Sequence, residues 1–176
     1  MSVFIYVGKS LDGFIAGKDG DLQWLNDIPN PENSDFGFSA FMERIDAVVM
    51  GRRTFEAVQS FGTWIYTRPV YVVSTILDRL PPEYDGKAQI LNLKPAQIIE
   101  ELGDRGYKNL YIDGGLVIQS FLAEDLIDEM IITTVPVLLG DGIPLFTNQA
   151  QQLKFRHVDT EILACHLVKT HYIRQR

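Results

Sequence analysis

The sequence predicts an α/β fold with an eight-stranded, mainly parallel sheet, four flanking helices and an antiparallel C-terminal hairpin. Three observations lead to this class. Short apolar segments alternate with segments that have the apolar spacing of a helix. The segment Val70–Val73 is apolar on both faces, as expected of a parallel strand between two helix layers. After Pro136, two strand-like segments follow each other with no helical pattern between them, which indicates an antiparallel edge.

The individual elements follow from the same patterns. The predicted strands are Val3–Val7, Asp46–Met50, Val70–Val73, Ala88–Leu91, Leu110–Ile112, Glu129–Val135, Leu153–Val158 and Ile162–Ile173. The predicted helices are Asp35–Ile45, Arg53–Gln59, Pro95–Leu102 and Leu116–Leu122. Apolar residues recur in the first helix at the spacing i, i+3, i+4, i+7, and the third begins at a proline and stops at Gly103. We expect the C-terminal hairpin to turn at Asp159-Thr160.

Length and charge limit what the chain can be. Its 176 residues, 46% of them apolar, are enough for one domain spanning residues 1–176 with its own core. The formal charge of −7 argues against a general nucleic-acid or anionic-membrane surface, and no apolar stretch is long enough to span a bilayer. Cys165 is the single cysteine, which excludes an internal disulfide; we interpret it as a small core residue of a cytoplasmic protein.

Two predicted strands lead directly through glycine into a helix, at Gly51 and at Gly114-Gly115. A helix N-terminus preceded by glycine presents free backbone N–H groups that suit a phosphate. Arg52 and Arg53 strengthen the first case, because cations are unfavourable at a helix N-terminus unless an anion lies nearby. The alternatives are that both arginines extend into solvent and that the glycine pair forms only a tight turn. Neither the G-x-G-x-x-G nor the P-loop fingerprint occurs in the chain.

Asp35 precedes the helix that contains Phe38, so we expect its carboxylate beside Phe36 in apolar surroundings. There it could bind an N–C–N edge with two hydrogen bonds or relay a proton. The alternative is an acid that stabilises the helix dipole. Trp24 is equally consistent with core packing and with a pocket wall. The histidines show no metal-ligand spacing, so no metal site is predicted.

Several segments together identify a family resemblance that runs along the whole chain. They are Ser10–Ala16, Asp46–Glu56, Val72–Thr75, Asp113–Gly115, Leu126–Glu129 and Val135–Gly142. With these segments the chain resembles the dihydrofolate reductase superfamily. It is more similar to the branch that contains the reductase domain of riboflavin deaminase–reductases and stand-alone bacterial relatives.

The resemblance implies roles for individual residues. NADPH is the implied cofactor, and the implied cofactor-binding residues are Ala16, Gly17, Gly51, Arg52, Arg53, Thr54, Ser74, Thr75, Gly114 and Gly115, the glycine pair often being joined by a cis peptide in the family. Asp35 lies sixteen residues before Gly51, as the substrate carboxylate of folate reductases does, and Thr133 matches the threonine that supports it. Asp35, Phe36, Trp24 and Arg68 are the expected substrate contacts. However, Arg68 is followed by Pro69, as in the riboflavin branch, and the stretch between Trp24 and Asp35 is longer than in folate reductases.

The sequence therefore predicts an NADPH-dependent reductase that transfers hydride to a pyrimidine or pterin-type heterocycle. The two reactions it most resembles are reduction of 5-amino-6-(5-phosphoribosylamino)uracil and of dihydrofolate. A non-catalytic module that binds NADPH or a pterin is the alternative. A homodimer is expected as well, because the C-terminal hairpin leaves a sheet edge exposed. Nucleic acid and membrane are not expected partners.

Overall fold

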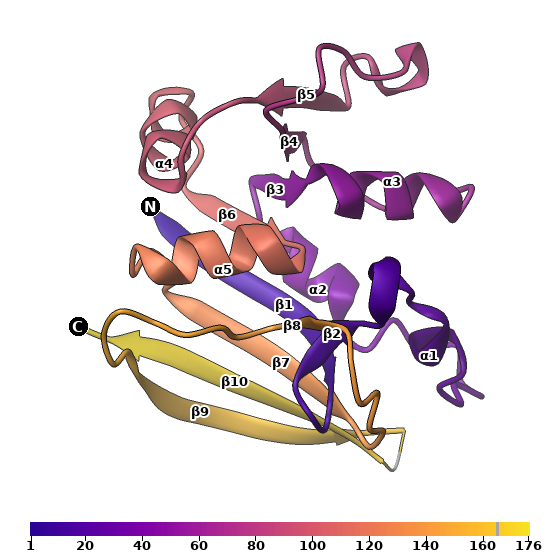
Figure 1. Ribbon diagram of the computed structural model, residues 1–176. Helices are drawn as coiled ribbons and strands as arrows, with labels where there is room; N and C mark the ends of the chain where they lie inside the picture. The colour runs from indigo at the N-terminus through magenta and orange to yellow at the C-terminus, as the bar shows by residue number, and fades with distance from the viewer. Residues whose placement is uncertain (165) are drawn as a thin grey trace.

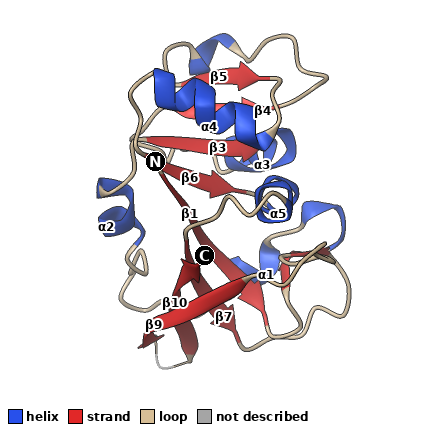
Figure 2. Cartoon of the chain, turned by 90° about the vertical axis from the view of Figure 1, so that its left-hand side faces the viewer, coloured by secondary structure: helices blue, strands red, loops and turns tan. Residues whose placement is uncertain are grey.

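Eight strands form one twisted sheet in the computed structural model, which describes residues 1–164 and 166–176 (Figures 1 and 2). Their order across the sheet is β5 (Ala88–Leu91), β4 (Val70–Val73), β3 (Ala47–Gly51), β6 (Asn109–Asp113), β1 (Ser2–Ser10), β7 (Glu129–Val135), β10 (Leu167–Gln175) and β9 (Lys154–Leu163). The strands from β5 to β7 pair in parallel, whereas β10 and β9 pair antiparallel. The predicted fold class is confirmed, while the interpretation of Cys165 lies outside the described residues.

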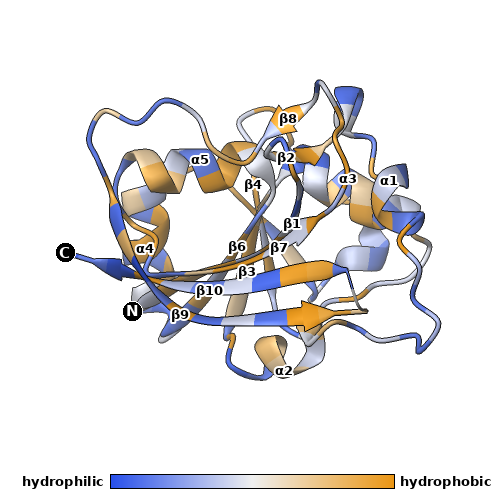
Figure 3. Cartoon of the chain, turned by 90° about the horizontal axis from the view of Figure 1, so that it is seen from below, coloured by the Kyte–Doolittle hydropathy of each residue, from blue (hydrophilic) through white to orange (hydrophobic). Residues whose placement is uncertain are grey.

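Helices cover both faces of the sheet, and each pair of helices closes its own apolar cluster. The helices α2 (Phe38–Glu43) and α3 (Arg52–Ser60) pack on one face, and α4 (Pro95–Asp104) and α5 (Gly115–Ala123) on the other. Figure 3 shows α2 and α5 on opposite sides of the strands. From α5, Val117, Ile118, Phe121 and Leu122 are buried. Each such side chain contributes roughly 1.5–3 kcal/mol by burial, which fixes α5 on the sheet.

Five short elements were not predicted from the sequence. They are α1 (Gln23–Asn26), the 3-10 turns η1 (Lys18–Gly20) and η2 (Pro82–Tyr84), and a two-stranded pair of β2 (Phe14–Ala16) with β8 (Ile143–Pro144). Each spans only two to four residues, too few to carry a periodic pattern. The β2–β8 pair brings the loop after β1 beside the loop after β7.

The helix expected at Asp35–Ile45 begins three residues later, at Phe38. Phe36 and Gly37 have φ angles of 56° and 94°, so the chain cannot enter a right-handed helix at Asp35. Asp35 instead accepts hydrogen bonds from the amides of Gly37 at 2.9 Å and Ser39 at 2.8 Å. Its carboxylate therefore satisfies donors at the start of α2.

The predicted turn at Asp159-Thr160 is wrong. Both residues lie inside β9, where they pair with His171 and Thr170 of β10. The register shifts between His171 and Tyr172, as in a β-bulge. Polar residues are tolerated here because most of β9 is exposed at the edge of the sheet, so a polar dipeptide does not have to form a turn.

Candidate functional site

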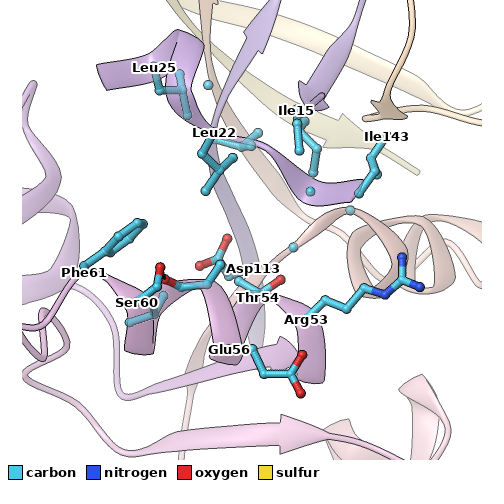
Figure 4. A pocket seen from close by; sticks show the side chains of 18 of the residues that line it. Ile15, Leu22, Leu25, Arg53, Thr54, Glu56, Ser60, Phe61, Asp113 and Ile143 are labelled. Atoms are coloured by element: carbon cyan, nitrogen blue, oxygen red, sulfur yellow. Dashed lines mark hydrogen bonds between the residues drawn. The ribbon is translucent and has the colours of Figure 1, made fainter. Parts of the chain in front are cut away.

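A pocket of about 790 Å³ lies at the carboxyl ends of β1, β3 and β6. This is the edge of a parallel sheet at which ligands bind in open α/β folds. The helix α3 runs along the pocket, with Arg52 and Arg53 at its first turn and Phe61 directly after its last residue. In Figure 4, Asp113 and Thr54 lie between Arg53 on one side and Phe61 on the other, with Leu22 and Leu25 opposite α3.

A cradle of glycines forms the wall between β3 and β6. A Cβ added at Gly114 would overlap Thr54 Oγ1, and one added at Gly115 would lie 2.8 Å from Ile15 Cδ1. Gly114 also has a φ of 86°, which disfavours other residues. The two glycines therefore allow Thr54, Ile15 and Ile143 to pack directly against the start of α5, whose first backbone N–H groups have no partner within the helix. The peptide bonds here are trans, so the cis peptide expected from the resemblance is not found.

A second pocket of about 320 Å³ adjoins the first and shares Arg52, Arg53, Thr54, Gly114 and Gly115 with it. It extends to the end of β4, where Ser74 and Thr75 lie. Every expected cofactor-binding residue except Gly17 therefore lines one of the two pockets; Gly17 lies next to Ala16 but outside both linings. The tertiary structure brings together glycines and arginines from two strand–helix junctions more than sixty residues apart in sequence.

The two arginines differ in their surroundings. Arg52 forms an ion pair with Glu56 at 2.6 Å, one turn further along α3. Arg53 is exposed, and no ion pair or side-chain hydrogen bond involves it among the described residues. Both side chains line both pockets. Arg53 is therefore the cation more available to an anionic ligand.

Two loops close the pocket from the side of β1. The Asp12 carboxylate accepts hydrogen bonds from Ser10 Oγ at 2.5 Å and from the Gly140 amide at 2.7 Å. Lys18 and Asp141 form an ion pair at 2.8 Å between the same two loops. A Cβ at Gly142 would overlap the Ala16 carbonyl oxygen. These contacts hold Ile15, Ala16 and Ile143 against the glycine cradle.

Asp113 is a pocket residue to which the sequence reasoning assigned no role. It is the last residue of β6, and its carboxylate accepts a 2.7 Å hydrogen bond from the Tyr66 hydroxyl. Burial raises the pKa of the Asp113 carboxyl, although the hydrogen bond from Tyr66 partly opposes the shift. A carboxyl that keeps its proton to higher pH can donate that proton to a ligand. Its position directly before Gly114-Gly115 is the sequence signal that could have identified it.

Aromatic rings form the end of the pocket away from the arginines. Phe38 lies edge-on to Tyr66 and Tyr111, with ring centroids 6.5 Å and 6.3 Å apart. Tyr6 and Phe38 are half-buried and both line the cavity. Burial, with the nearby carboxylates of Asp35 and Glu161, raises the pKa of Tyr6 to about 12, so its phenol remains neutral. This end offers flat, uncharged surfaces.

The expected substrate residues are not gathered in this pocket. Asp35 is exposed rather than in apolar surroundings, and hydrogen bonds from Ser39 and Gly37 lower the pKa of its carboxyl to about 2. The Phe36 carbonyl accepts hydrogen bonds from Tyr6 Oη at 2.7 Å and Lys169 Nζ at 3.2 Å, which tie this segment to the sheet. The expected apolar environment of Asp35 is therefore wrong, because the left-handed turn at Phe36-Gly37 precedes the helix.

Trp24, Arg68 and Thr133 also lie outside the pocket lining. Arg68 is positioned to donate to the carbonyls of Met42 and Glu43 at 3.5 and 3.4 Å, at the end of α2. Thr133 lies on β7, where it pairs with Gly8 of β1. It is therefore far from Asp35 in sequence and on a different element. Trp24 lies on α1, between the pocket residues Leu22 and Leu25.

Two searches of the described residues found nothing. No group of three His, Cys, Asp or Glu side chains is arranged to hold a metal ion. None of the described helices has the length and apolarity needed to cross a membrane.

Comparison with known proteins gives consistent matches. Residues 2–169 match the family model of the RibD C-terminal domain. YwjB of Bacillus subtilis (strain 168), an uncharacterized protein, is 33% identical over 174 residues, which cover 97% of this chain and 96% of YwjB. A provisionally assigned riboflavin biosynthesis protein from Shewanella sp. PV-4 is 46% identical, with a TM-score of 0.95 and full coverage of both chains.

More distant structures show the fold alone. A deaminase/5-amino-6-(5-phosphoribosylamino)uracil reductase from Thermotoga maritima has a TM-score of 0.73 at 15% identity, covering 99% of this chain and 56% of that one. Dihydrofolate reductase from Enterococcus faecalis, complexed with NADP(H), has a TM-score of 0.70 at 17% identity, covering 99% and 97%. The expected dihydrofolate reductase-like fold is confirmed.

Proposed function

Because this chain belongs to the RibD C-terminal domain family, we propose that it is an NADPH-dependent reductase of a pyrimidine or pterin-type heterocycle. The observation that carries the proposal is the pair of strand–helix junctions at Gly51 and Gly114. They lie side by side, open to one continuous groove with Arg53 at its rim. Each junction presents backbone N–H groups to an anion, as the phosphates of a dinucleotide require.

The glycine cradle supports the fit of the cofactor. Gly114 and Gly115 allow Thr54, Ile15 and Ile143 to pack against the start of α5. The pyrophosphate would lie beside these side chains, at the backbone N–H groups of that helix. Arg53 would bind the 2′-phosphate, with Ser74 and Thr75 beside it at the end of β4. Ala16 and Ile143 would cover the nicotinamide end and exclude water. When bound, NADPH supplies a hydride from its nicotinamide ring.

Asp113 would supply the proton that the reduction needs. Its carboxyl lies in the pocket between the glycine cradle and the aromatic end, and its raised pKa favours the protonated form. As hydride adds to the carbon of a C=N or C=O group, the Asp113 proton passes to the nitrogen or oxygen. The products are NADP⁺, the reduced heterocycle and an Asp113 carboxylate, which takes a proton from solvent. Tyr66 holds the carboxyl in place through its hydrogen bond.

Crystals of the protein soaked with NADPH test the site. Density for the dinucleotide along Gly51, Arg53 and Gly114 supports the proposal, and density elsewhere or none after saturating soaks contradicts it. Loss of NADPH absorbance is then measured with dihydropterins and with the ribosylaminopyrimidine. Binding of NADPH at the site without consumption by any heterocycle would instead indicate the non-catalytic binding module.

We also propose that the protein forms a homodimer. β9 is at the edge of the sheet and pairs on one side only, with β10. Val158 and Ile162 expose apolar side chains along it, Ile162 at 69%. An exposed edge with apolar side chains is a ready surface for a second copy.

A further inference from the structure

The pocket has two chemically different ends, joined at Asp113. We name as the cofactor end the residues that the two pockets share: Arg52, Arg53, Thr54, Gly114, Gly115 and Ile143. The acceptor end consists of Leu22, Leu25, Phe38, Phe61, Ile65 and Tyr66. The helix α3 runs from Arg52 at the cofactor end to Phe61, directly after its last residue, at the acceptor end. A bound heterocycle would therefore meet the acceptor end and not the arginines.

The acceptor end has no cation among the described residues that line the pocket. Arg52 and Arg53 are the only Lys or Arg side chains in that lining, and both belong to the cofactor end. The charged residues that complete the lining are acids: Asp19, Glu56 and Asp113. An anionic group placed against Phe38 and Tyr66, the less exposed part of the acceptor end, would thus lose its hydration without gaining a counter-charge.

Cations near this region are occupied by other contacts. Lys169 forms a 2.7 Å ion pair with Glu161 and also donates to the Phe36 carbonyl. Arg68 lies against the carbonyls at the end of α2. Lys9 lines a separate pocket together with Met130 and Phe155. None of the three reaches into the lining of the main pocket.

Asp35 does not provide the expected pair of hydrogen bonds to an N–C–N edge of the ligand. Both of its carboxylate oxygens accept hydrogen bonds from the amides of Gly37 and Ser39, outside the pocket. Its carboxylate holds the amides at the start of α2 and is not part of the pocket lining, so Asp35 does not contact a ligand bound there. The acceptor end therefore recognises its ligand by flat aromatic and aliphatic contact, with the Asp113 carboxyl as the polar group within reach.

We propose that the acceptor is an uncharged, flat, conjugated C=N or C=O compound that bears neither a phosphate nor a carboxylate tail. The inference rests on the proposed reductase function and narrows its substrate class. It separates this chain from a reductase of a phosphoribosyl compound, whose phosphate would require a cation at the acceptor end. A dephosphorylated nucleoside-type pyrimidine or a simple dihydropterin meets the description.

Two matched pairs of ligands test this inference. One pair is 5-amino-6-(ribosylamino)uracil with and without its 5′-phosphate. The other is dihydrofolate and 6-methyl-7,8-dihydropterin, which share a ring but differ in the carboxylated tail. Dissociation constants are measured by calorimetry on the full chain, with and without saturating NADP⁺. We expect the uncharged member of at least one pair to bind at least tenfold more tightly than its anionic partner. Equal or tighter binding of the anionic member in both pairs overturns the inference, as does binding of none of the four compounds.

A cation placed at the acceptor end provides an independent check. Ile65 is 43% exposed, so Ile65→Lys keeps the core intact. This variant should bind the phosphorylated pyrimidine at least tenfold more tightly than the wild type does. Leu138→Lys, at a residue that is 73% exposed and lines neither pocket, should leave the affinity unchanged. No gain in Ile65→Lys, or the same gain in both variants, overturns the inference.

Different results would contradict the reductase function and the substrate class. Calorimetry with NADPH alone tests the reductase function, because cofactor binding does not involve the acceptor end. If NADPH binds and the phosphorylated pyrimidine is bound or reduced as well as its dephosphorylated form, the substrate class is wrong and the reductase stands. If NADPH does not bind, the reductase function is wrong, whatever the ligand pairs show.

Discussion

The hydroxyl of Tyr66 donates a 2.7 Å hydrogen bond to Asp113 Oδ2, joining the loop after α3 to the last residue of β6 inside the pocket. The two side chains lie 47 residues apart in sequence. Burial raises the pKa of the carboxyl, and the hydrogen bond lowers it in part. The pair therefore sets the pH range over which Asp113 can give up a proton.

Asp113→Asn should reduce kcat roughly 100-fold, the usual effect of removing a general acid.

In the wild type, activity should fall as pH rises through the raised pKa of Asp113, because only the protonated carboxyl donates. Tyr66→Phe removes an interaction that lowers this pKa, so the falling limb should move to higher pH. Tyr84→Phe is the control, since no hydrogen bond of its hydroxyl occurs among the described contacts and its ring packs on Phe55. A shift to lower pH in Tyr66→Phe would contradict the assignment.

The same carboxyl should make the protein less stable as pH rises. Between the ordinary pKa of 3.8 and the raised pKa of the folded state, the folded chain binds more protons than the unfolded chain. The free energy of unfolding contributed by this group therefore falls across that interval. Asp113→Asn has no such titration, so relative to the wild type it should gain stability as pH rises from the ordinary pKa through the raised pKa, measured by urea denaturation. A relative loss over this interval would contradict a raised pKa.

The arginines should contribute unequally to cofactor preference. A charge-assisted hydrogen bond to a 2′-phosphate contributes on the order of 1.5–3 kcal/mol, about tenfold or more in affinity. Arg53→Ala should reduce the preference for NADPH over NADH at least tenfold. Arg52→Ala should reduce it less, because Glu56 already pairs with Arg52. The ratio of kcat/KM for the two cofactors is the measurement, with the exposed Arg79→Ala as control. An unchanged ratio of kcat/KM in the variant that combines Arg52→Ala with Arg53→Ala would refute the cofactor assignment.

Gly114→Ala should destabilise the fold and weaken NADPH binding together. The added Cβ would overlap Thr54 Oγ1, and the resulting shift of Thr54 or of the backbone would disturb the proposed pyrophosphate site beside it. Gly86→Ala is the matched control, because Gly86 has a similar φ of 75° with nothing within 4 Å of the added Cβ. We expect Gly114→Ala to lower the free energy of unfolding by about 1–3 kcal/mol more than Gly86→Ala does, because only the Cβ at residue 114 overpacks its surroundings. Adding Thr54→Ala to Gly114→Ala should restore part of that stability but not the cofactor affinity. Equal losses in the two single variants would exclude the steric contact.

The homodimer is tested by sedimentation at micromolar concentration, where the proposal expects about twice the chain mass of 19.9 kDa. Ile162→Lys places a charge on the exposed edge of β9 and should shift the equilibrium to the monomer. Leu138→Lys, on the loop after β7, should not. A single monomeric species of the wild-type chain would exclude this part of the proposal.

Most of the sheet could be predicted because its inner strands are apolar runs or alternate between apolar and polar residues. Val70–Val73 and Glu129–Val135 have the same bounds in the structure as in the prediction. The prediction failed where local signals compete with tertiary contacts. Asp159-Thr160 resembles a turn, yet pairing with β10 keeps it extended. The apolar spacing around Phe38 suggested a helix from Asp35, yet the left-handed turn at Phe36-Gly37 delays its start.

Of the candidate site, too, one part could be predicted from the sequence and the other could not. The cofactor end could be predicted because strand, glycine and helix follow one another along the chain at Gly51 and at Gly114, so the anion-binding backbone is encoded locally. The acceptor end could not, because its walls come from α1, α2 and the loop after α3, which share no local motif. Asp35 shows the limit of a matching spacing: its distance from Gly51 fits the resemblance, but its carboxylate is bound to the amides at the start of α2.

By itself the sequence determined the α/β class, the order of the long elements and the two strand–glycine–helix junctions, since all of these depend on neighbours within one strand–helix unit. Only the tertiary structure decided which side chains share the cavity, because that depends on how segments distant in sequence pack across the sheet. It placed Asp113 and Tyr66 together and left Asp35 and Arg68 outside. Burial and solvent access, which set the charge of the acceptor end, exist only once those segments have packed.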